Sequence, residues 1–210
     1  MHIAKTILLL LCLAVSGICT AKQRYLFYLH GRIVEVQGPN AVDKDHGWGA
    51  YQYNDILKTF SSRGFTVISE CRPPDTDVNK YAQKVAAQID SLLKKGAKAA
   101  DITVVGASKG GAIAMLVSGI AKHPGVNYVF LGCCPGTFAA QGKLCGNILS
   151  IYELSDDIGQ SCGNVRQKSP NPIPNFKEIA INTGRHHGFL YHPLAEWVEP
   201  TVAWAKENYK

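Results

Sequence analysis

The chain has 210 residues, of which 46% are hydrophobic and 18% charged, and its formal net charge is +6. This length suits one ordinary domain with a hydrophobic core, and no internal repeat or low-complexity segment divides it. The positive residues are scattered, and their densest group, Lys94, Lys95 and Lys98, is typical of a solvated helix end, so we expect no nucleic-acid partner.

The first 21 residues have the layout of a secretory signal peptide. Lys5 supplies a positive charge, residues 7–15 form a continuous apolar run, and small residues precede a cleavage point ahead of Lys22. The apolar run is about half of the roughly 20 residues that a membrane-spanning helix needs. We therefore expect residues 22–210 to form one exported domain, periplasmic or secreted, with no stable membrane insertion after cleavage.

The rest of the chain alternates predicted strands with predicted helices. Apolar and β-branched runs predict six strands, over residues 25–29, 65–69, 102–105, 126–131, 147–153 and 176–182. Helical spacing of apolar residues predicts helices over residues 48–63, 77–95 and 110–121, and a closing helix from Pro193 that Pro200 kinks or splits. This order predicts an α/β fold, with a mostly parallel sheet covered by helices on both faces.

Three long stretches carry no clear pattern, namely residues 33–47, 132–146 and 155–175. Loops of this length are often functional, and here we expect them to form the walls of a cleft. None is long enough for a separate lid domain.

Residues 106–110 read Gly-Ala-Ser-Lys-Gly, a Gly-x-Ser-x-Gly pattern between a predicted strand and a predicted helix. On such a sharp turn the serine is strained and its hydroxyl projects, while the flanking glycines avoid collisions with the neighbouring strand and helix. The N-terminus of the following helix favours negative charge nearby. Ser108 is therefore the candidate nucleophile, and the alternative is an ordinary helix N-cap.

Four separated features of the chain resemble the α/β-hydrolase family in their order. His30–Gly31 ends the first predicted strand, where that family has its oxyanion loop, and Ser108 follows a later one. The carboxylates of Asp156–Asp157 and the imidazoles of His186–His187 come next, which is the family's order of serine, acid and histidine. The resemblance covers nearly all of residues 22–210. It implies a compact hydrolase fold, serine-esterase activity and no cofactor.

The resemblance leaves a choice between adjacent residues at two places. The family's acid commonly opens an Asp-x-hydrophobic pattern, which favours Asp156 over Asp157. The small residue that follows the family's histidine favours His187 over His186, because Gly188 comes next. The predicted catalytic triad is therefore Ser108, Asp156 and His187.

The chemistry of acyl transfer explains why these residue types are needed. A serine hydroxyl needs a base to take its proton, and imidazole accepts and returns one near neutral pH, while the carboxylate fixes the imidazole tautomer. By resemblance, the backbone N–H groups of Lys109 and Arg32 bind the oxyanion, with Ile33 as a substitute for Arg32. We expect the side chains of Lys109 and Arg32 to be free to contact substrate, and His30 to shape the oxyanion loop.

The cysteines and histidines could also serve as disulfide partners or metal ligands. Five cysteines follow residue 21, and in an exported protein their odd number predicts a disulfide and at least one free thiol. A bridge from Cys133 or Cys134 to Cys162 would brace the loop that carries the acid. No CxxC pair indicates zinc. A metal cluster of His186, His187 and His192 lacks a defined ligand spacing, so we expect no metal.

We therefore expect an acyl-enzyme mechanism acting on a small-molecule ester or related acyl substrate. Two alternatives stay open at this point. The same triad would serve an amidase or peptidase, and a chain that kept the scaffold without turnover would be a binding protein.

Overall fold

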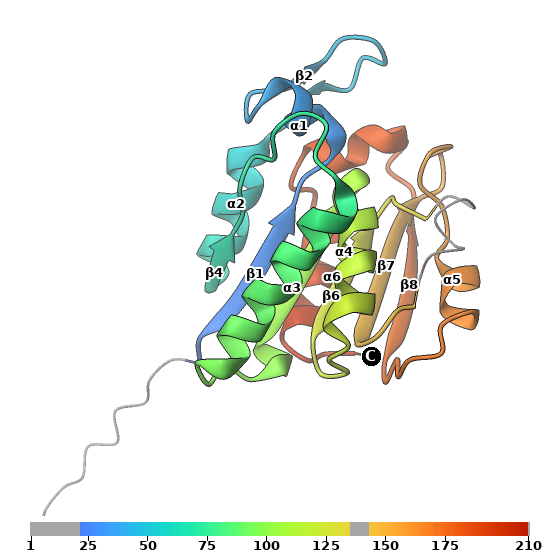
Figure 1. The fold of residues 1–210 in the computed structure, drawn as a ribbon. Helices are drawn as coiled ribbons and strands as arrows, with labels where there is room; N and C mark the ends of the chain where they lie inside the picture. Colours follow the sequence, from blue (N-terminus) through green and yellow to red (C-terminus); the bar gives the residue numbers. More distant parts are fainter. Residues whose placement is uncertain (1–21, 135–142, 210) are drawn as a thin grey trace, which may run out of the picture.

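The computed structural model describes residues 22–134 and 143–209, so the predicted signal peptide lies outside the described residues. Six strands form one sheet in the order β4-β1-β5-β6-β7-β8, and all neighbouring strands are parallel (Figure 1). Their bounds are β1 Arg24–Leu29, β4 Phe65–Ile68, β5 Ile102–Ala107, β6 Asn127–Leu131, β7 Asn147–Glu153 and β8 Phe176–Ile181. The predicted fold class and all six predicted strands are confirmed.

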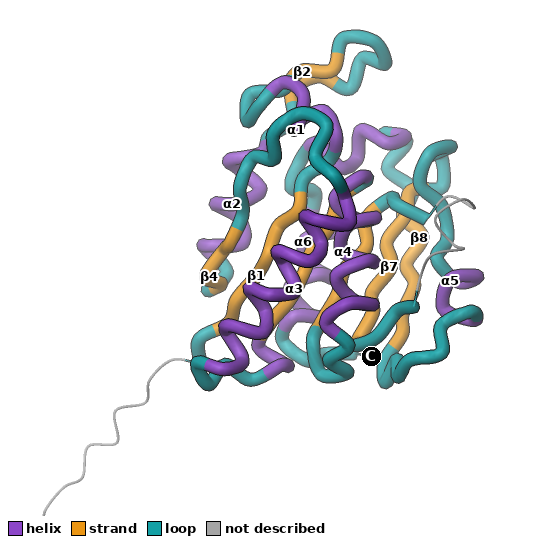
Figure 2. The backbone as a smooth tube through the Cα atoms, viewed as in Figure 1, coloured by secondary structure: helices purple, strands orange, loops and turns teal. Residues whose placement is uncertain are grey.

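Helices cover both faces of this sheet (Figure 2). One face packs against α2 and α6, and the other against α3, α4 and α5. The bounds of these helices are α2 Tyr53–Ser62, α3 Val78–Lys94, α4 Lys109–Ala121, α5 Gly163–Gln167 and α6 Ala195–Ala205. Because every strand is parallel, the carboxyl ends of all six lie along one edge of the sheet, and the loops that follow them meet there.

Alternation along β1 shows how the two faces are filled. Leu26 and Tyr28 belong to the hydrophobic cluster under α2 and α6, whereas Phe27 and Leu29 belong to the cluster under α3 and α4. Successive side chains of a strand point to opposite faces. Residues 26–29 are buried and carry apolar or aromatic side chains on both faces, as is usual in parallel sheets.

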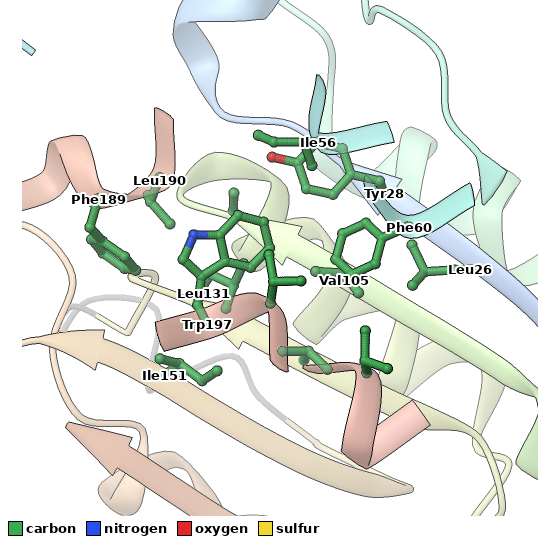
Figure 3. Packing of buried hydrophobic residues seen from close by; sticks show 14 of the residues in the cluster. Leu26, Tyr28, Ile56, Phe60, Val105, Leu131, Ile151, Phe189, Leu190 and Trp197 are labelled. Atoms are coloured by element: carbon green, nitrogen blue, oxygen red, sulfur yellow. The ribbon is translucent and has the colours of Figure 1, made fainter. Parts of the chain in front are cut away.

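The cluster under α2 and α6 also anchors the segment that carries His187 (Figure 3). Phe189 and Leu190 lie in the short 3₁₀ helix η3 (His186–Tyr191) and are 0% and 1% exposed. They pack in the same cluster as Trp197 of α6, whose ring centroid is 5.9 Å from that of Phe60. Full burial of such a side chain is worth about 1.5–3 kcal/mol, so the core fixes the backbone next to His187.

The stretch over residues 33–47, predicted as irregular, contains regular structure. A six-residue helix, α1 (Arg32–Gln37), opens it. A small antiparallel hairpin of β2 (Val42–Asp43) and β3 (Gly49–Ala50) follows. The helix predicted from residue 48 begins instead at Tyr53, because residues 49–50 pair with β2 and leave the helical path.

The C-terminal half shows two smaller differences. The stretch over residues 155–175 contains the short helix α5 (Gly163–Gln167). The closing helix α6 begins at Ala195 instead of Pro193 and continues across Pro200, so Pro200 does not split it. A disulfide joins Cys134 to Cys162, with 5.2 Å between their Cα atoms, which is one of the two pairings considered. Among the described residues, no helix combines the length and the hydropathy needed to cross a bilayer.

Candidate active site

Ser108 lies on a tight turn between β5 and α4. Its φ of 53° and ψ of −119° fall outside the common regions for a residue with a side chain, a strain of about 1–3 kcal/mol. A Cβ at Gly106 would lie 2.3 Å from the carbonyl oxygen of Gly110, and a Cβ at Gly110 would lie 1.9 Å from that of Leu29. Both glycines of the motif are therefore required by close backbone packing, as the sequence pattern predicts.

The structure brings Ser108, His187 and Asp156 into one line of hydrogen bonds. His187 Nδ1 donates to Asp156 Oδ2 at 2.7 Å, so Nε2 is left to accept from Ser108 Oγ at 2.8 Å. The other carboxylate oxygen of Asp156 accepts from the backbone N–H of Ile158 at 2.9 Å. Asp156 and His187 are 5% and 6% exposed, so both groups are shielded from water.

The neighbouring acid and histidine point elsewhere. His186 Nδ1 donates to the backbone oxygen of Ser155 at 2.6 Å, and its side chain is exposed. Asp157 is also exposed. The geometry thus selects Asp156 and His187 as the partners of Ser108, and His186 instead helps to join the loop after β8 to the loop after β7.

The predicted oxyanion donors lie at the starts of two helices. Lys109 opens α4 directly after Ser108, and Arg32 opens α1. The first N–H groups of a helix have no acceptor within the helix, so they are free to bind a ligand oxygen. The loop before α1 passes close to the serine. A Cβ added at Gly31 would lie in van der Waals contact with Ser108 Cβ, at 3.6 Å. Ile33 shares the first turn of α1 and stays an alternative to Arg32.

The side chain of Lys109 is not free, contrary to expectation. Its Nζ lies 2.5 Å from Glu35 Oε1 and donates to the backbone oxygen of Thr76 at 3.1 Å. Glu35 is 3% exposed, and its Oε2 accepts from Arg72 Nε at 3.2 Å. The buried carboxylate therefore holds the ammonium group, and Lys109 does not line the cleft, whereas Arg32 is exposed and lines it.

His30 connects this charged cluster to the oxyanion loop. Its Nδ1 donates to the backbone oxygen of Gly31 at 2.9 Å, and its Nε2 accepts from the backbone N–H of Arg72 at 2.9 Å. The Arg72 guanidinium also donates to the backbone oxygen of His30. Burial, together with the charge of Arg72, lowers the pKa of His30 to about 4, so its imidazole is neutral at pH 7. The expected loop-shaping role fits these contacts.

A second buried glutamate joins the loops that carry Asp156 and His187. Glu153 ends β7 and is 1% exposed. Its Oε2 accepts from the backbone N–H and the hydroxyl of Thr183 at 2.7 and 2.6 Å, and its Oε1 from the hydroxyl of Ser155 at 3.1 Å. The Ser155 hydroxyl in turn accepts from the backbone N–H of His186 at 3.2 Å. Burial raises the pKa of Glu153, but these hydrogen bonds outweigh it and lower the pKa overall.

A cleft of about 810 Å³ opens over Ser108 and His187. The β2–β3 hairpin forms one wall, and Trp48, just before β3, lies against the site, with its ring centroid 5.8 Å from that of His187. His46 stacks on the same indole at 4.3 Å. The volume falls within the usual range of about 300–1,000 Å³ for small-molecule sites.

One group of side chains among the described residues has the spacing of metal ligands. The three sulfur atoms of Cys133, Cys134 and Cys162 lie within 4.8 Å of one another, the one such group found there. Two of them form the disulfide, so a single thiol is left to offer a ligand. Burial raises the pKa of the Cys133 thiol to about 12, which keeps it protonated. Metals bind the thiolate, so this group does not fit a metal ion.

Sequence reasoning missed Glu35, Arg72, Glu153 and Trp48. Glu153 carried a signal, since a carboxylate that ends an apolar strand of a parallel sheet lies at the edge where sites form. For Glu35 and Arg72 there was none, because each lies in a segment without a pattern and they meet only in the fold.

Known family models do not match the chain, and curated proteins do not match it either. Solved structures match its fold. SOBER1 of Arabidopsis thaliana superposes with a TM-score of 0.58 at 13% identity, over 90% of this chain and 100% of that one. An esterase/lipase from an uncultured bacterium gives 0.59 at 14%, over 90% and 77%. A YdeN-like hydrolase of Pectobacterium atrosepticum gives 0.57 at 11%, over 90% and 94%. At these identities the likeness concerns the fold alone.

Proposed function

We propose that this chain, which has the α/β-hydrolase fold, is a serine hydrolase that cleaves an ester or related acyl substrate through an acyl-enzyme on Ser108. The observation that carries this proposal is the continuous line of hydrogen bonds from Ser108 through His187 to Asp156. Two of the similar solved structures are described as an esterase/lipase and a hydrolase, which supports this class of reaction.

In the proposed first step, Ser108 Oγ attacks the substrate's carbonyl carbon while His187 Nε2 takes the hydroxyl proton. Asp156 holds the imidazole by its Nδ1–H and stabilises the imidazolium that forms. The tetrahedral intermediate then collapses, its bond to the leaving group breaks, and His187 returns the proton to the departing alcohol. A water molecule repeats the sequence on the acyl-enzyme, releasing the acid and restoring Ser108.

The negative oxygen of each intermediate would be bound by the backbone N–H groups of Lys109 and Arg32. Lys109 opens the 13-residue helix α4, so the partial positive charge of that helix N-terminus would lie next to the reacting carbonyl. One such donor is typically worth about 10²–10³ in rate. Ser108 Oγ already lies 2.8 Å from His187 Nε2, so little rearrangement is needed for the proton transfer.

One part of the cleft wall is apolar and suits an uncharged acyl or alcohol group, while Arg32, Asp43, Lys44 and Asp45 line other parts of it. Val36, Val42 and Ile158 line the apolar part and are 56%, 38% and 47% exposed. They are three of the five large apolar side chains that are exposed in the described part of the chain. Apolar surface left open beside a reactive serine is a binding surface for an apolar substrate group. We propose a small-molecule ester as the substrate on this ground.

The test is reaction with a fluorophosphonate probe and turnover of acyl esters by the wild type and by Ser108→Ala. We expect labelling at Ser108, with loss of fluoride, and ester hydrolysis in the wild type only. The matched control is Ser62→Ala, an exposed helix serine that bonds only to its own helix, which should label and turn over as the wild type does. Hydrolysis or labelling that survives in Ser108→Ala refutes the proposal, and a wild type that neither labels nor turns over indicates a binding protein.

Comparison of acyl esters with the corresponding amides separates the esterase from the amidase or peptidase reading. We expect turnover of the esters and no measurable turnover of the amides. Serine peptidases also hydrolyse esters, so it is turnover of the amides that would assign the chain to the amidases or peptidases.

We also propose that the protein is exported after cleavage ahead of Lys22, because residues 1–21 have the layout of a signal peptide. Mass spectrometry of the protein purified from its native host should find Lys22 at the N-terminus, and an intact Met1 would contradict this.

A further inference from the structure

The carboxylate of Glu35 lies where the two candidate oxyanion segments meet. Glu35 belongs to α1, three residues after Arg32, and its side chain is 1% exposed. Oε1 accepts from Lys109 Nζ at 2.5 Å and from the backbone N–H of Thr76 at 3.2 Å, and Oε2 accepts from Arg72 Nε at 3.2 Å. One carboxylate thus joins α1 to two other segments, the loop between β4 and α3 that holds Arg72 and Thr76, and the start of α4 at Lys109.

Each of these bonds reaches a residue tied to a candidate donor. Lys109 carries the N–H that follows Ser108, so its side chain connects that turn directly to Glu35. The helix that carries Glu35 begins with the other donor, Arg32. Arg32 and Lys109, which carry the two N–H groups, are 77 positions apart in the chain. The ion pair between Glu35 and Lys109 links the helices that they open, α1 and α4, directly.

Arg72 adds a second link to the same loop. Its guanidinium bonds both Glu35 and the backbone oxygen of His30, and its backbone N–H donates to His30 Nε2. His30 Nδ1 donates to the oxygen of Gly31, the residue immediately before Arg32. The backbone is therefore held on both sides of the Arg32 N–H, by Glu35 from within α1 and by His30 from the preceding loop.

The charges of Glu35, Lys109 and Arg72 are compatible with a negative oxygen bound nearby. Burial raises the pKa of Glu35, but its bonds to Lys109 and Arg72 outweigh burial and lower the pKa overall, so it is ionised at pH 7. With His30 neutral, one carboxylate and two cations leave a net charge of +1 behind the oxyanion segments. A carboxylate alone at this place would oppose the developing negative charge, whereas the paired cluster does not.

We propose that Glu35 is a positioning residue, which through Lys109 and Arg72 fixes the spacing between the backbone N–H groups of Arg32 and Lys109. This inference rests on the proposed function of Ser108. Glu35 touches no substrate, and its effect is on the transition state, where an oxyanion donor displaced by about 1 Å costs on the order of 10²-fold in rate.

Two variants test it. Glu35→Gln removes the charge at nearly constant volume, and Lys109→Met removes only the ammonium and leaves the Glu35–Arg72 pair in place. Glu199→Gln and Lys84→Met are matched controls, because each breaks an exposed ion pair, with Arg63 and Glu70 respectively. For each protein we would measure kcat and KM on a soluble acyl ester, the inhibition constant of a boronic acid that forms a tetrahedral adduct with serine, and the thermal midpoint.

We expect kcat to fall about 10- to 100-fold in both variants with KM within about two-fold, since only a transition-state interaction is weakened. Boronic acid inhibition should weaken by a similar factor, because its oxygen occupies the same N–H groups. The double variant should lose little more than the worse single one, since both remove one interaction. The controls should match the wild type.

Unchanged kcat in folded Glu35→Gln and Lys109→Met would overturn the positioning role, and so would a higher KM at constant kcat. If Glu35→Gln does not fold, Lys109→Met decides alone. The fluorophosphonate probe distinguishes failure of this inference from failure of the proposed function. If the wild type is labelled at Ser108 and the variants are fully active, only the role of Glu35 is refuted. If the wild type is neither labelled nor active, both are refuted.

Discussion

Two buried glutamates lie on opposite sides of the candidate site, and they are held in different ways. Glu35 is bonded by two cations, Lys109 and Arg72. Glu153 is bonded by neutral donors, the hydroxyl and backbone N–H groups of Thr183 and Ser155. Both connect loops that follow the parallel strands, so each side of the cleft is fixed by one carboxylate.

The difference in partners matches the charge that each side would have to stabilise. Around Glu35 the charges sum to +1, next to the N–H groups proposed to receive a negative oxygen. Around Glu153 the carboxylate keeps its charge, and Asp156 on the following loop adds another, next to the histidine proposed to become positive. Two buried glutamates thus lie in surroundings of opposite net charge, because one is paired with cations and the other with neutral donors.

The largest expected effect is on kcat, from a change at Asp156 on the side of the cleft that holds Glu153. We expect Asp156→Asn to lower kcat by about 10⁴, because an amide favours the wrong tautomer of His187 and does not stabilise its cation. Asp157→Asn, one residue further on and exposed, should stay within about two-fold of the wild type. The measurement is steady-state ester hydrolysis, with circular dichroism to show that both variants fold. Equal losses in the two variants would remove Asp156 from the proposed triad.

A smaller effect separates the two glutamates. Glu153→Gln leaves one of its donors facing an amide NH₂, so we expect a loss of about 1–3 kcal/mol in the free energy of unfolding. Because Glu153 contacts the loops and not the oxyanion segments, kcat should fall less than about ten-fold, against the larger fall expected for Glu35→Gln. Urea unfolding and ester hydrolysis measure the two quantities. A kcat loss in Glu153→Gln exceeding that in Glu35→Gln would reverse the contrast.

The smallest effect concerns acid stability. The pKa values of Glu35 and Glu153 are both below the usual 4.5, since hydrogen bonds to each carboxylate outweigh its burial. Their ionised forms therefore stabilise the fold above pH 4.5, and this contribution is lost as the pH falls through the folded-state values. We expect the free energy of unfolding, measured in urea between pH 6 and pH 3, to drop less steeply in Glu153→Gln than in the wild type. Parallel curves would contradict the assignment.

Local patterns explain why so much of the site was predictable. The turn at Ser108 is encoded by glycines that close backbone contacts require, and runs rich in apolar and β-branched residues mark the strands of the sheet. Asp156 and His187 follow β7 and β8, and a parallel sheet brings the ends of such strands together whatever the loops do.

What could not be predicted depends on contacts between distant segments. The β2–β3 hairpin forms because residues 42–43 pair with residues 49–50, which overrides the helical spacing that extends back to residue 48. Lys109 looked free because nothing near it in sequence is acidic, and its partner Glu35 is 74 positions away. Arg72 gave no pattern at all, although it is fully enclosed at 2% exposure.

The ion pairs of Lys22 have a practical consequence. Lys22 Nζ lies 2.7 Å from Asp101 and 2.6 Å from Glu207, which joins the segment before β1 to the turn after α6. This junction is at the amino ends of the strands, on the far side of the molecule from the β2–β3 hairpin (Figure 1). A resin, fusion partner or affinity tag attached near residue 22 or residue 209 would therefore leave the mouth of the cleft facing the solution, so immobilised protein should keep its access to dissolved esters.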